Sequence, residues 1–258
     1  MRMVASGVTS GRVRLDVLLV DRGLAPSRER AQSLVMAGAV TVDGTPADKP
    51  GRAVRADADV AVVAKDHPWA SRGGVKLAAA LDAFAVDPAG KRCLDVGAST
   101  GGFTDVLLHR GAAQVVALDV GRGQLDWRLR QDPRVVVMDG INARHLTPGD
   151  LVGPFGLVTV DVSFISLALV LPALLPFVAA DGDVVALVKP QFEVGKGKVG
   201  RGGVVRDAAL REEAIVTVLA AASALGLACA GRLASPLPGP AGNVEELVLL
   251  RRRGAQSS

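Results

Sequence analysis

Seven short apolar runs recur between residues 91 and 251, and stretches with helical periodicity separate most of them. Runs such as QVVALDV (114–120) and DVVALVK (183–189) are rich in Val, Leu and Ala, which is typical of strands buried on both faces. The intervening helical stretches include residues 75–84, 102–110 and 208–225. This alternation predicts an α/β domain whose mostly parallel sheet is covered by helices on both faces.

The first part of the chain has a different pattern. In RLDVLLVDRGLAPSRERAQSLVMAGAVTVDG (14–44), leucines and valines recur at helical spacing. Ser27 is placed to cap a second helix that ends at Gly38, and residues 39–42 have the composition of a strand that enters a turn. We therefore expect a flexible N-terminus at 1–11, a small α+β module at 12–66, a linker at 67–73, the α/β domain at 74–252 and a tail at 253–258.

Composition restricts the class of protein. The formal net charge of +4 and the pI of about 9.4 allow an anionic partner without requiring one. Both cysteines, Cys93 and Cys229, lie within apolar runs, so we interpret them as small buried residues of a cytoplasmic protein rather than as a disulfide. The three histidines have no paired Cys/His spacing, which argues against a metal site.

Two uncharged windows, residues 162–180 and 214–231, approach the length of a membrane span. The first contains two prolines, and the second contains Thr, Ser and Gly. Each window also fits a strand plus a buried helix of an α/β core. The N-terminus lacks the apolar segment of a signal peptide. We therefore expect no stable membrane association.

A glycine-rich loop, LDVGASTGGFTDVLL (94–108), follows the first strand of the α/β domain. Its glycines would let the backbone approach a ligand at a helix N-terminus, although the spacing is not that of a dinucleotide fingerprint. Asp95 carries a negative charge at this loop, which would attract the α-amino group of a ligand and repel a pyrophosphate. Asp119, after the next strand, is placed for ribose hydroxyls, and Asn142 is placed for an adenine edge.

A ligand with an amino group, a ribose and an adenine at these positions would be S-adenosylmethionine. A nicotinamide dinucleotide is the competing interpretation. Capping or surface roles remain possible for each acidic residue alone. The candidate cofactor-binding residues are Asp95, Gly97, Ser99, Gly101, Gly102, Phe103, Asp119 and Asn142.

Two further strands end on charged residues, Asp161 and Lys189. Ligands of parallel sheets bind beyond the carboxyl ends of the strands, so both side chains are expected at one crevice. Glu245 would join them if the last strand runs antiparallel, and Lys76 opens the helix before the first strand. A lysine acts as a general base only when it is neutral, and burial beside a second ammonium favours that form. We interpret Lys189 as the general base, which Asp161 orients, and Lys76 and Glu245 as residues that complete the network and hold the ribose. The alternative is that the four residues form a structural salt-bridge cluster.

The chain resembles the TlyA, or haemolysin A, family of bacterial rRNA methyltransferases. The stretches that carry this resemblance are SRGGVKL, CLDVGASTGGFTDVLL, VDVSFISL, LVKPQFEVGKGKVGRGGVVRD and SPLPGPAGNVEE. The resemblance implies a Rossmann-like S-adenosylmethionine methyltransferase sheet of seven strands with the last antiparallel. It also implies a catalytic tetrad, which matches Lys76, Asp161, Lys189 and Glu245. The implied activity is 2′-O-methylation of cytidine in rRNA of the small or large ribosomal subunit.

The N-terminal module is similar to the alpha-L RNA-binding motif. This similarity implies that basic residues at five positions contact rRNA: Arg12, Arg14, Arg28, Lys49 and Arg72. Such a module would track phosphates and RNA shape. Charge alone leaves open a solvated face, because Asp16, Asp21 and Glu29 are interleaved. The loop GKGKVGRGG (195–203) is interpreted as a mobile flap whose Lys196 and Lys198 reach RNA, or as a loop that only aids solubility.

Three functions are therefore compared. The first is a monomeric rRNA 2′-O-methyltransferase that acts on ribosomal subunits. The second, suggested by the older family name, is a membrane-active haemolysin. The third is a non-catalytic RNA-binding assembly factor, against which the complete tetrad argues.

Overall fold

The computed structural model describes residues 11–36, 38–47, 49–63, 67–195 and 197–254. The chain divides into two compact units, residues 1–71 and 72–258. Of the predicted flexible N-terminus and C-terminal tail, only residues 11, 253 and 254 belong to the described part.

The N-terminal unit is a small α+β module with its own core. Its elements are β1 (Arg12–Arg14), α1 (Leu15–Asp21), α2 (Arg28–Met36), β2 (Val40–Val42), β3 (Thr45–Pro46), β4 (Ala53–Arg55) and β5 (Val60–Val62). Strand β1 pairs with β4, and β2 lies between β3 and β5. The backbone N–H of Arg30 donates to Ser27 Oγ at 3.2 Å, which confirms Ser27 as a cap of α2. Leu15 and Leu19 of α1 are completely buried and share this core with Ala31 and Val35 of α2.

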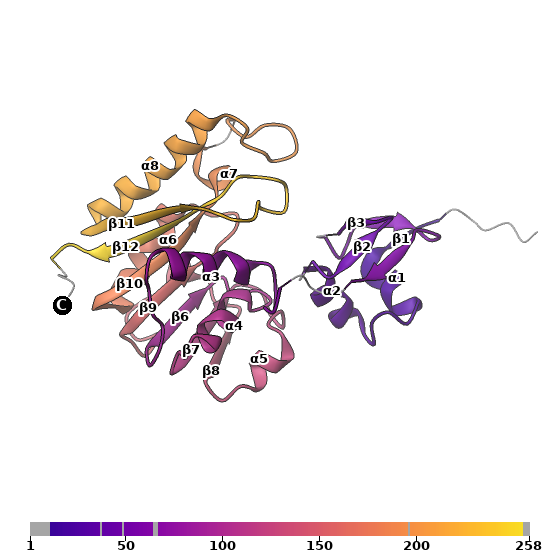
Figure 1. Cartoon of the computed structure of the whole chain (residues 1–258), viewed down its shortest axis with the longest axis horizontal. Coiled ribbons are helices and arrows are strands. Elements are labelled where there is room, and N and C mark those ends of the chain that lie inside the picture. Colours follow the sequence, from indigo (N-terminus) through magenta and orange to yellow (C-terminus); the bar gives the residue numbers. More distant parts are fainter. Residues whose placement is uncertain (1–10, 37, 48, 64–66, 196, 255–258) are drawn as a thin grey trace, which may run out of the picture. The chain divides into compact units, whose positions relative to one another are not determined.

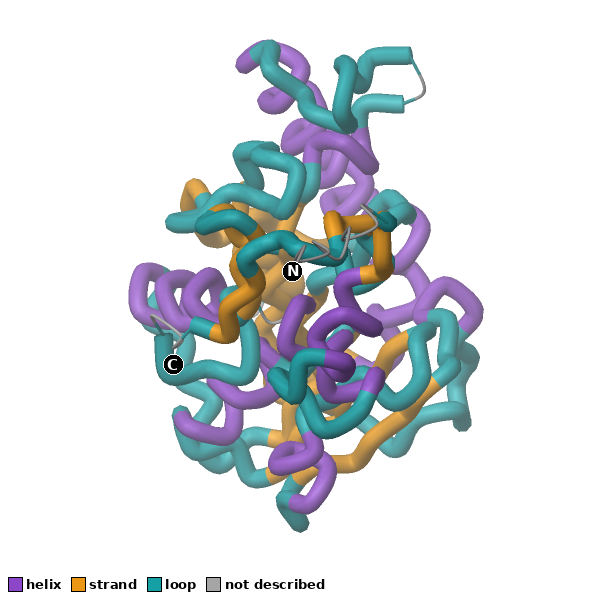
Figure 2. Tube along the Cα trace, turned by 90° about the vertical axis from the view of Figure 1, so that its right-hand side faces the viewer, coloured by secondary structure: helices purple, strands orange, loops and turns teal. Residues whose placement is uncertain are grey.

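The C-terminal unit alternates helices and strands (Figures 1 and 2). Its strands are β6 (Arg92–Val96), β7 (Gln114–Asp119), β8 (Val135–Asp139), β9 (Phe155–Val160), β10 (Val178–Val188), β11 (Leu227–Ala234) and β12 (Glu246–Arg252). Its helices are α3 (Gly73–Ala83), α4 (Gly102–His109), α5 (Trp127–Gln131), α6 (Leu167–Leu174), α7 (Pro190–Glu193) and α8 (Ala208–Ala224), with short 3₁₀ turns η1 (Ala143–His145) and η2 (Leu175–Phe177).

Within the described residues, seven strands form one sheet in the order β11-β12-β10-β9-β6-β7-β8. Strands β10, β9, β6, β7 and β8 are parallel, and β12 is antiparallel to both of its neighbours. The predicted α/β class and the antiparallel last strand are therefore confirmed. The strand order reverses between β6 and β9, and this switch point is where open parallel sheets bind ligands.

Both faces of the sheet are covered, which explains the unbroken apolar runs. One face packs on α6 and α8, because alternate residues of β6, β9 and β10 such as Leu94, Val158 and Val184 share a core cluster with these helices. The intervening residues face the other side, where α3 and α4 pack against each other (Figure 1). A strand buried on both sides has no polar alternation.

The two uncharged windows of membrane length belong to this fold. Residues 162–180 contain α6 and the start of β10, and residues 214–231 contain the end of α8 and the first half of β11. Among the residues that the structure describes, no helix combines the length and the apolar character needed to cross a bilayer.

One prediction about the core is wrong. Cys93 on β6 is buried, but Cys229 is exposed. Strand β11 is the edge of the sheet, and its pairing with β12 is irregular between Cys229 and Gly231. An apolar run on an edge strand therefore leaves part of its side chains in solvent.

Candidate active site and RNA-binding face

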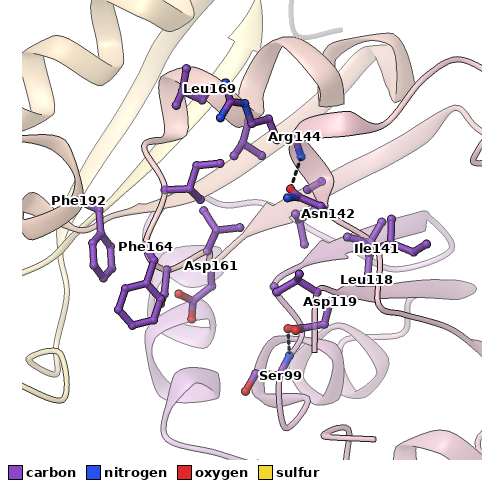
Figure 3. Close-up of a pocket in the computed structure, with 18 of the residues that line it drawn as sticks. Ser99, Leu118, Asp119, Ile141, Asn142, Arg144, Asp161, Phe164, Leu169 and Phe192 are labelled. Atoms are coloured by element: carbon purple, nitrogen blue, oxygen red, sulfur yellow. Dashed lines mark hydrogen bonds between the residues drawn. The ribbon is translucent and has the colours of Figure 1, made fainter. Parts of the chain in front are cut away.

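A cavity of about 640 Å³ opens at the carboxyl edge of the sheet, beside the switch point. Its walls come from the segments that follow β6, β7, β8 and β9 (Figure 3). Among the predicted cofactor-binding residues, those that line it are Gly97, Ser99, Asp119 and Asn142. Phe103 and Gly102 are buried at the start of α4. The cavity wall mixes carboxylates and amides with apolar side chains, as small-molecule sites do.

Two glycines with left-handed backbones shape the glycine loop. Gly97 has φ of +83°, and a Cβ atom there would lie 2.4 Å from the carbonyl oxygen of Asp161. Gly101, the N-cap of α4, has φ of +93°, and a Cβ there would lie 2.2 Å from the end of the Leu129 side chain. Glycine suits both positions because of the backbone conformation, and at Gly97 also because a side chain would meet rigid backbone. The loop after β6 is therefore packed directly on the end of β9.

Asp119 holds this loop in place. Its Oδ2 accepts a hydrogen bond from the Ser99 backbone N–H at 2.8 Å, and its Oδ1 accepts one from Gly121 N–H at 2.6 Å (Figure 3). Each carboxylate oxygen keeps a further lone pair for a ligand hydroxyl. Asn142 caps η1, because its Oδ1 accepts from the backbone N–H of Arg144 at 3.1 Å, and the residue also lines the cavity.

Asp95 differs from its expected placement. Its side chain is fully buried, and it accepts hydrogen bonds from Thr104 Oγ1 at 2.6 Å and Thr159 Oγ1 at 3.0 Å. Burial raises the pKa of Asp95 to about 7; the two threonine hydroxyls oppose this rise, and the charge of Asp161 adds to it. Asp95 was expected in the turn, where it would meet an α-amino group, but it lies inside β6. Its hydrogen bonds join β6 to α4 and β9, and Asp95 is not among the residues that line the cavity.

Lys189 and Asp161 form one ion pair. Lys189 Nζ lies 2.6 Å from Asp161 Oδ1, and it donates a hydrogen bond to Ser163 Oγ at 2.9 Å. The lysine side chain is only 12% exposed, and Asp161 lines the cavity. The short spacing of Asp161 and Ser163 in VDVSF brings both oxygens to one ammonium group. Sequence reasoning did not identify Ser163 as a partner, although a hydroxyl two residues after a candidate acid is a usable signal.

Lys76 and Glu245 form a second ion pair that is almost completely buried. Lys76 Nζ donates to Glu245 Oε2 at 2.5 Å, and the Glu245 side chain has no exposed surface. The other oxygen, Oε1, makes no hydrogen bond with any described residue. It lies against Gly239, where a Cβ atom would come within 2.3 Å. The loop SPLPGPAGN therefore needs a glycine at this position for the carboxylate to fit.

Sheet register gathers both pairs at one edge. Val188 of β10 is the partner of Glu246 in β12, so Lys189 and Glu245 lie next to this last pairing. Val160 of β9 aligns with Ala186 of β10, which places Asp161 at the same edge. Lys76 reaches this edge from the first turn of α3. The structure therefore brings the four predicted residues to one rim as two ion pairs.

An aromatic pair stands beside this rim. Phe164 is 91% exposed and has φ of +66°, an uncommon conformation for a bulky residue. Its ring centroid lies 5.1 Å from that of Phe192 on α7 (Figure 3). Helix α7 is tied to α6 by Glu193, which accepts from Ser166 Oγ at 2.5 Å and from Leu167 N–H at 2.9 Å. The two rings are inclined to each other by 49°, and both line the cavity, where the exposed Phe164 ring offers an apolar face.

The N-terminal unit carries a group of exposed basic residues. Arg12 and Arg14 project from one side of β1, and Val13 between them packs on the core. The register with β4 places Arg55 directly opposite Arg12. Arg55 also pairs with Asp57 at 3.2 Å, so part of its charge is already compensated on the protein. Arg55 was missed by sequence reasoning, because only the strand pairing brings it to this face.

The other predicted RNA-binding residues have different surroundings. Arg28 and Lys49 are exposed on the N-terminal unit, and Arg72 is exposed at the start of α3. Lys198 pairs with Glu213 of α8 at 2.5 Å, and Lys196 lies outside the described residues. The loop after α7 is anchored, because buried Asn243 accepts from Val205 N–H and donates to the Gly203 carbonyl, at 2.9 and 2.8 Å.

Comparison with known proteins assigns both units. Residues 69–252 match the FtsJ-like methyltransferase family, and residues 13–60 match the S4 domain. A Mycobacterium tuberculosis protein named 16S/23S rRNA (cytidine-2'-O)-methyltransferase TlyA is 57% identical, over 93% of this chain and 90% of the relative. The chain belongs to the TlyA family. The resemblance inferred from sequence motifs is therefore confirmed, and the chain is a methyltransferase.

Other members of the TlyA family carry a different name. Hemolysin A of Brachyspira hyodysenteriae is 38% identical, over 91% of this chain and 98% of the relative. A Streptococcus thermophilus protein solved as a candidate hemolysin shares 41% identity with a TM-score of 0.73, over 96% of this chain and 94% of that chain.

In the described part of this TlyA-family chain, no group of His, Cys, Asp and Glu side chains is arranged to hold a metal ion.

Proposed function

We propose that this chain transfers a methyl group from S-adenosylmethionine to the ribose 2′-hydroxyl of a cytidine in rRNA. The name of the Mycobacterium tuberculosis relative supports the reaction and the substrate. The observation that carries the proposal is the Lys189 ammonium, held 2.6 Å from Asp161 at the wall of the cavity beside the glycine loop. This is where a methyl donor and an acceptor hydroxyl would have to meet.

The cavity fits S-adenosylmethionine. Its volume of about 640 Å³ is in the usual range for small-molecule sites. The Asp119 carboxylate has lone pairs left for ribose hydroxyls, and the Asn142 amide provides a donor for the adenine edge. Gly97, whose backbone packs closely on Asp161, also lines the cavity. When bound there, S-adenosylmethionine supplies an electrophilic methyl group.

The chain's own residues provide the acid–base chemistry. Asp161 and Ser163 fix the position of Lys189 Nζ, and among the described residues no other side-chain nitrogen forms an ion pair with Asp161. In its neutral form, Lys189 Nζ takes the proton from the 2′-hydroxyl as the new C–O bond forms. The buried pair of Lys76 and Glu245 holds the adjoining strand end rigid, so that the hydroxyl meets a fixed base.

RNA would be held at two places. The exposed arginines of the S4 unit meet phosphates, and this contact is electrostatic and salt-dependent. The aromatic pair of Phe164 and Phe192 offers a stacking surface for a nucleobase at the cavity mouth. Because the ribosomal particle is itself a large partner, we propose that a cytoplasmic monomer acts on it.

The test uses the full-length protein with purified small and large ribosomal subunits and tritiated S-adenosylmethionine. Label should enter rRNA, and mass mapping should place it on a cytidine ribose. Label on a base, or in no RNA at all, would contradict the proposal. Liposome leakage with the same preparation tests the haemolysin alternative, and subunit binding without methyl transfer would indicate an assembly factor.

A further inference from the structure

Asp16 is the most completely enclosed acidic residue of the N-terminal unit. It has no exposed surface, although it lies only two residues after the exposed Arg14 in the sequence. Its Oδ1 and Oδ2 accept from Arg14 Nε at 3.0 Å and Nη2 at 2.8 Å, and Oδ2 also accepts from Arg28 Nε at 3.0 Å. Gln32 Nε2 donates to the same Oδ2 at 2.9 Å. Asp16 is therefore not part of a solvated face of alternating charges.

These contacts place two guanidinium groups side by side. Arg14 and Arg28 both donate to the single oxygen Oδ2, so their charged groups are held within a few ångströms of each other. Both side chains stay about half exposed, at 49% and 51%. Two positive charges that share one carboxylate leave a local charge of +1. This charge is complementary to one phosphodiester group.

The backbone fixes the Arg14 guanidinium from a second side. A Cβ atom added to Gly51 would lie 3.1 to 3.3 Å from the Nη1, Nη2 and Cζ atoms of Arg14. The loop that carries Gly51 is itself attached to the start of α1, because Asp16 N–H donates to the Pro50 carbonyl at 3.0 Å. Arg14 is thus held between a carboxylate and a glycine backbone.

The outward nitrogens of the two arginines are available. Among the described residues, Arg14 Nη1 and both terminal nitrogens of Arg28 make no hydrogen bond. Guanidinium groups recognise phosphate best when two donors are presented in a fixed geometry. A preformed pair also avoids the entropy cost of ordering two long side chains on binding.

We propose that Asp16 is a positioning residue that presents Arg14 and Arg28 as a preformed clamp for one backbone phosphate of a folded RNA. This inference rests on the proposed rRNA substrate and extends it to a named contact. Asp16 itself touches no phosphate; it acts through the two arginines. The same buried carboxylate also ties β1 to α2, so a test must separate positioning from folding.

The direction of the change in RNA binding tells a positioning role of Asp16 from a simple charge effect. Removing a negative charge from a basic surface by itself strengthens the attraction of that surface for RNA. If Asp16 positions the arginines, its removal weakens binding instead. Asp21 lies in the same helix and is exposed, so Asp21→Asn removes an equal charge without touching the clamp. Gly51→Ala places a methyl group 3.1 to 3.3 Å from the Arg14 guanidinium, so this group must shift by a few tenths of an ångström with no change of charge.

The experiment measures binding of full-length variants to purified ribosomal subunits and to a generic RNA hairpin, over a salt series. We expect Asp16→Asn to bind about tenfold more weakly, with a smaller salt dependence, and Gly51→Ala to change in the same direction by a smaller factor. Asp21→Asn should bind equally or more tightly. In an Arg14→Ala, Arg28→Ala background, Asp16→Asn should have no further effect.

The proposal is refuted if Asp16→Asn binds RNA as tightly as the parent or more tightly. It is also refuted if Asp16→Asn weakens RNA binding by the same factor in the Arg14→Ala, Arg28→Ala background as in the parent. If Asp16→Asn unfolds the N-terminal unit by circular dichroism, then Gly51→Ala decides, and unchanged binding by that variant refutes the proposal. A different pattern is expected if the chain does not act on rRNA at all. The parent protein would then neither bind nor methylate ribosomal subunits, while the measured affinities for the RNA hairpin would still show whether Asp16→Asn and Asp21→Asn differ.

Discussion

Lys76 and Glu245 are 169 residues apart in the chain, yet their side chains meet at 2.5 Å in the interior of the methyltransferase unit. Both side chains are withdrawn from water, with 9% and 0% exposed. A buried charge is tolerable only with its partner. This pair therefore ties α3 to the start of β12 at the rim where Lys189 and Asp161 lie.

Lys76→Met should destabilise the protein by about 3–5 kcal/mol, because it leaves the Glu245 carboxylate buried and unpaired. The double variant Lys76→Met, Glu245→Gln should recover much of this loss, since no isolated charge then remains. Urea denaturation of four proteins, the parent, the single variants Lys76→Met and Glu245→Gln, and the double variant, measures the coupling. Additive losses in the double variant would show that the two side chains do not act as a pair.

Lys189→Ala should lower the rate of methyl transfer by about 10²–10⁴-fold, because it removes the proposed base. Lys189→Arg should be nearly as inactive, since arginine does not release its proton at working pH. Single-turnover transfer of tritiated methyl to ribosomal subunits is the measurement. Arg110→Ala, which removes a surface ion pair with Asp82, is the control and should keep parental activity. Activity in Lys189→Ala would refute the assignment.

Gly97→Ala should abolish activity and destabilise the fold, because its methyl group would lie 2.4 Å from the Asp161 carbonyl oxygen. Gly90→Ala is the matched control: its φ of +70° is similar to the +83° of Gly97, but no atom lies within 4 Å of the added Cβ. Both variants pay about 1 kcal/mol for the left-handed backbone. Only Gly97→Ala should move Asp161. Equal activity in the two variants would contradict this account of the loop.

Asp95→Asn should become stabilising relative to the parent as pH rises. Burial raises the pKa of Asp95 from 3.8 to about 7, so the folded state binds a proton that the unfolded state has lost between these values. Parental stability therefore carries a contribution that falls with rising pH, by up to about 1.4 kcal/mol per pH unit. Asparagine has no such titration. Denaturation at pH 5, 6, 7 and 8 should show a difference that grows up to about pH 7 and then levels off, because above this pKa both states are ionised. A constant difference from pH 5 onward would show that Asp95 is ionised throughout.

Local pattern was sufficient for much of the architecture. Each strand of the large sheet corresponds to an apolar run in the sequence, and in the central strands β6, β9 and β10 burial on both faces removes the polar alternation. Ser27 was identifiable as a cap because capping depends on residues within one turn. The tetrad was placed at one edge because strand ends of a parallel sheet share an edge whatever the details of packing.

The surroundings of individual side chains depend on tertiary packing and could not be predicted from the local sequence pattern. Asp95 and Asp119 both lie at or near strand ends, but Asp95 faces the core and Asp119 faces the cavity. Asp16 looks like any charged residue of a basic segment, yet it is enclosed by Arg14 and Arg28. Cys229 lies in an apolar run and is exposed because β11 is an edge.

The sequence by itself determined the order of helices and strands, the two units, the family and the four residues that gather at the rim, since these depend on local periodicity and on motifs. Tertiary structure alone decided that the four residues form two pairs, that Arg55 lies opposite Arg12, and that Asp16 is buried. The physical reason is that solvation and ion pairing depend on atoms brought together across long stretches of chain, and neither can be read from neighbours in the sequence.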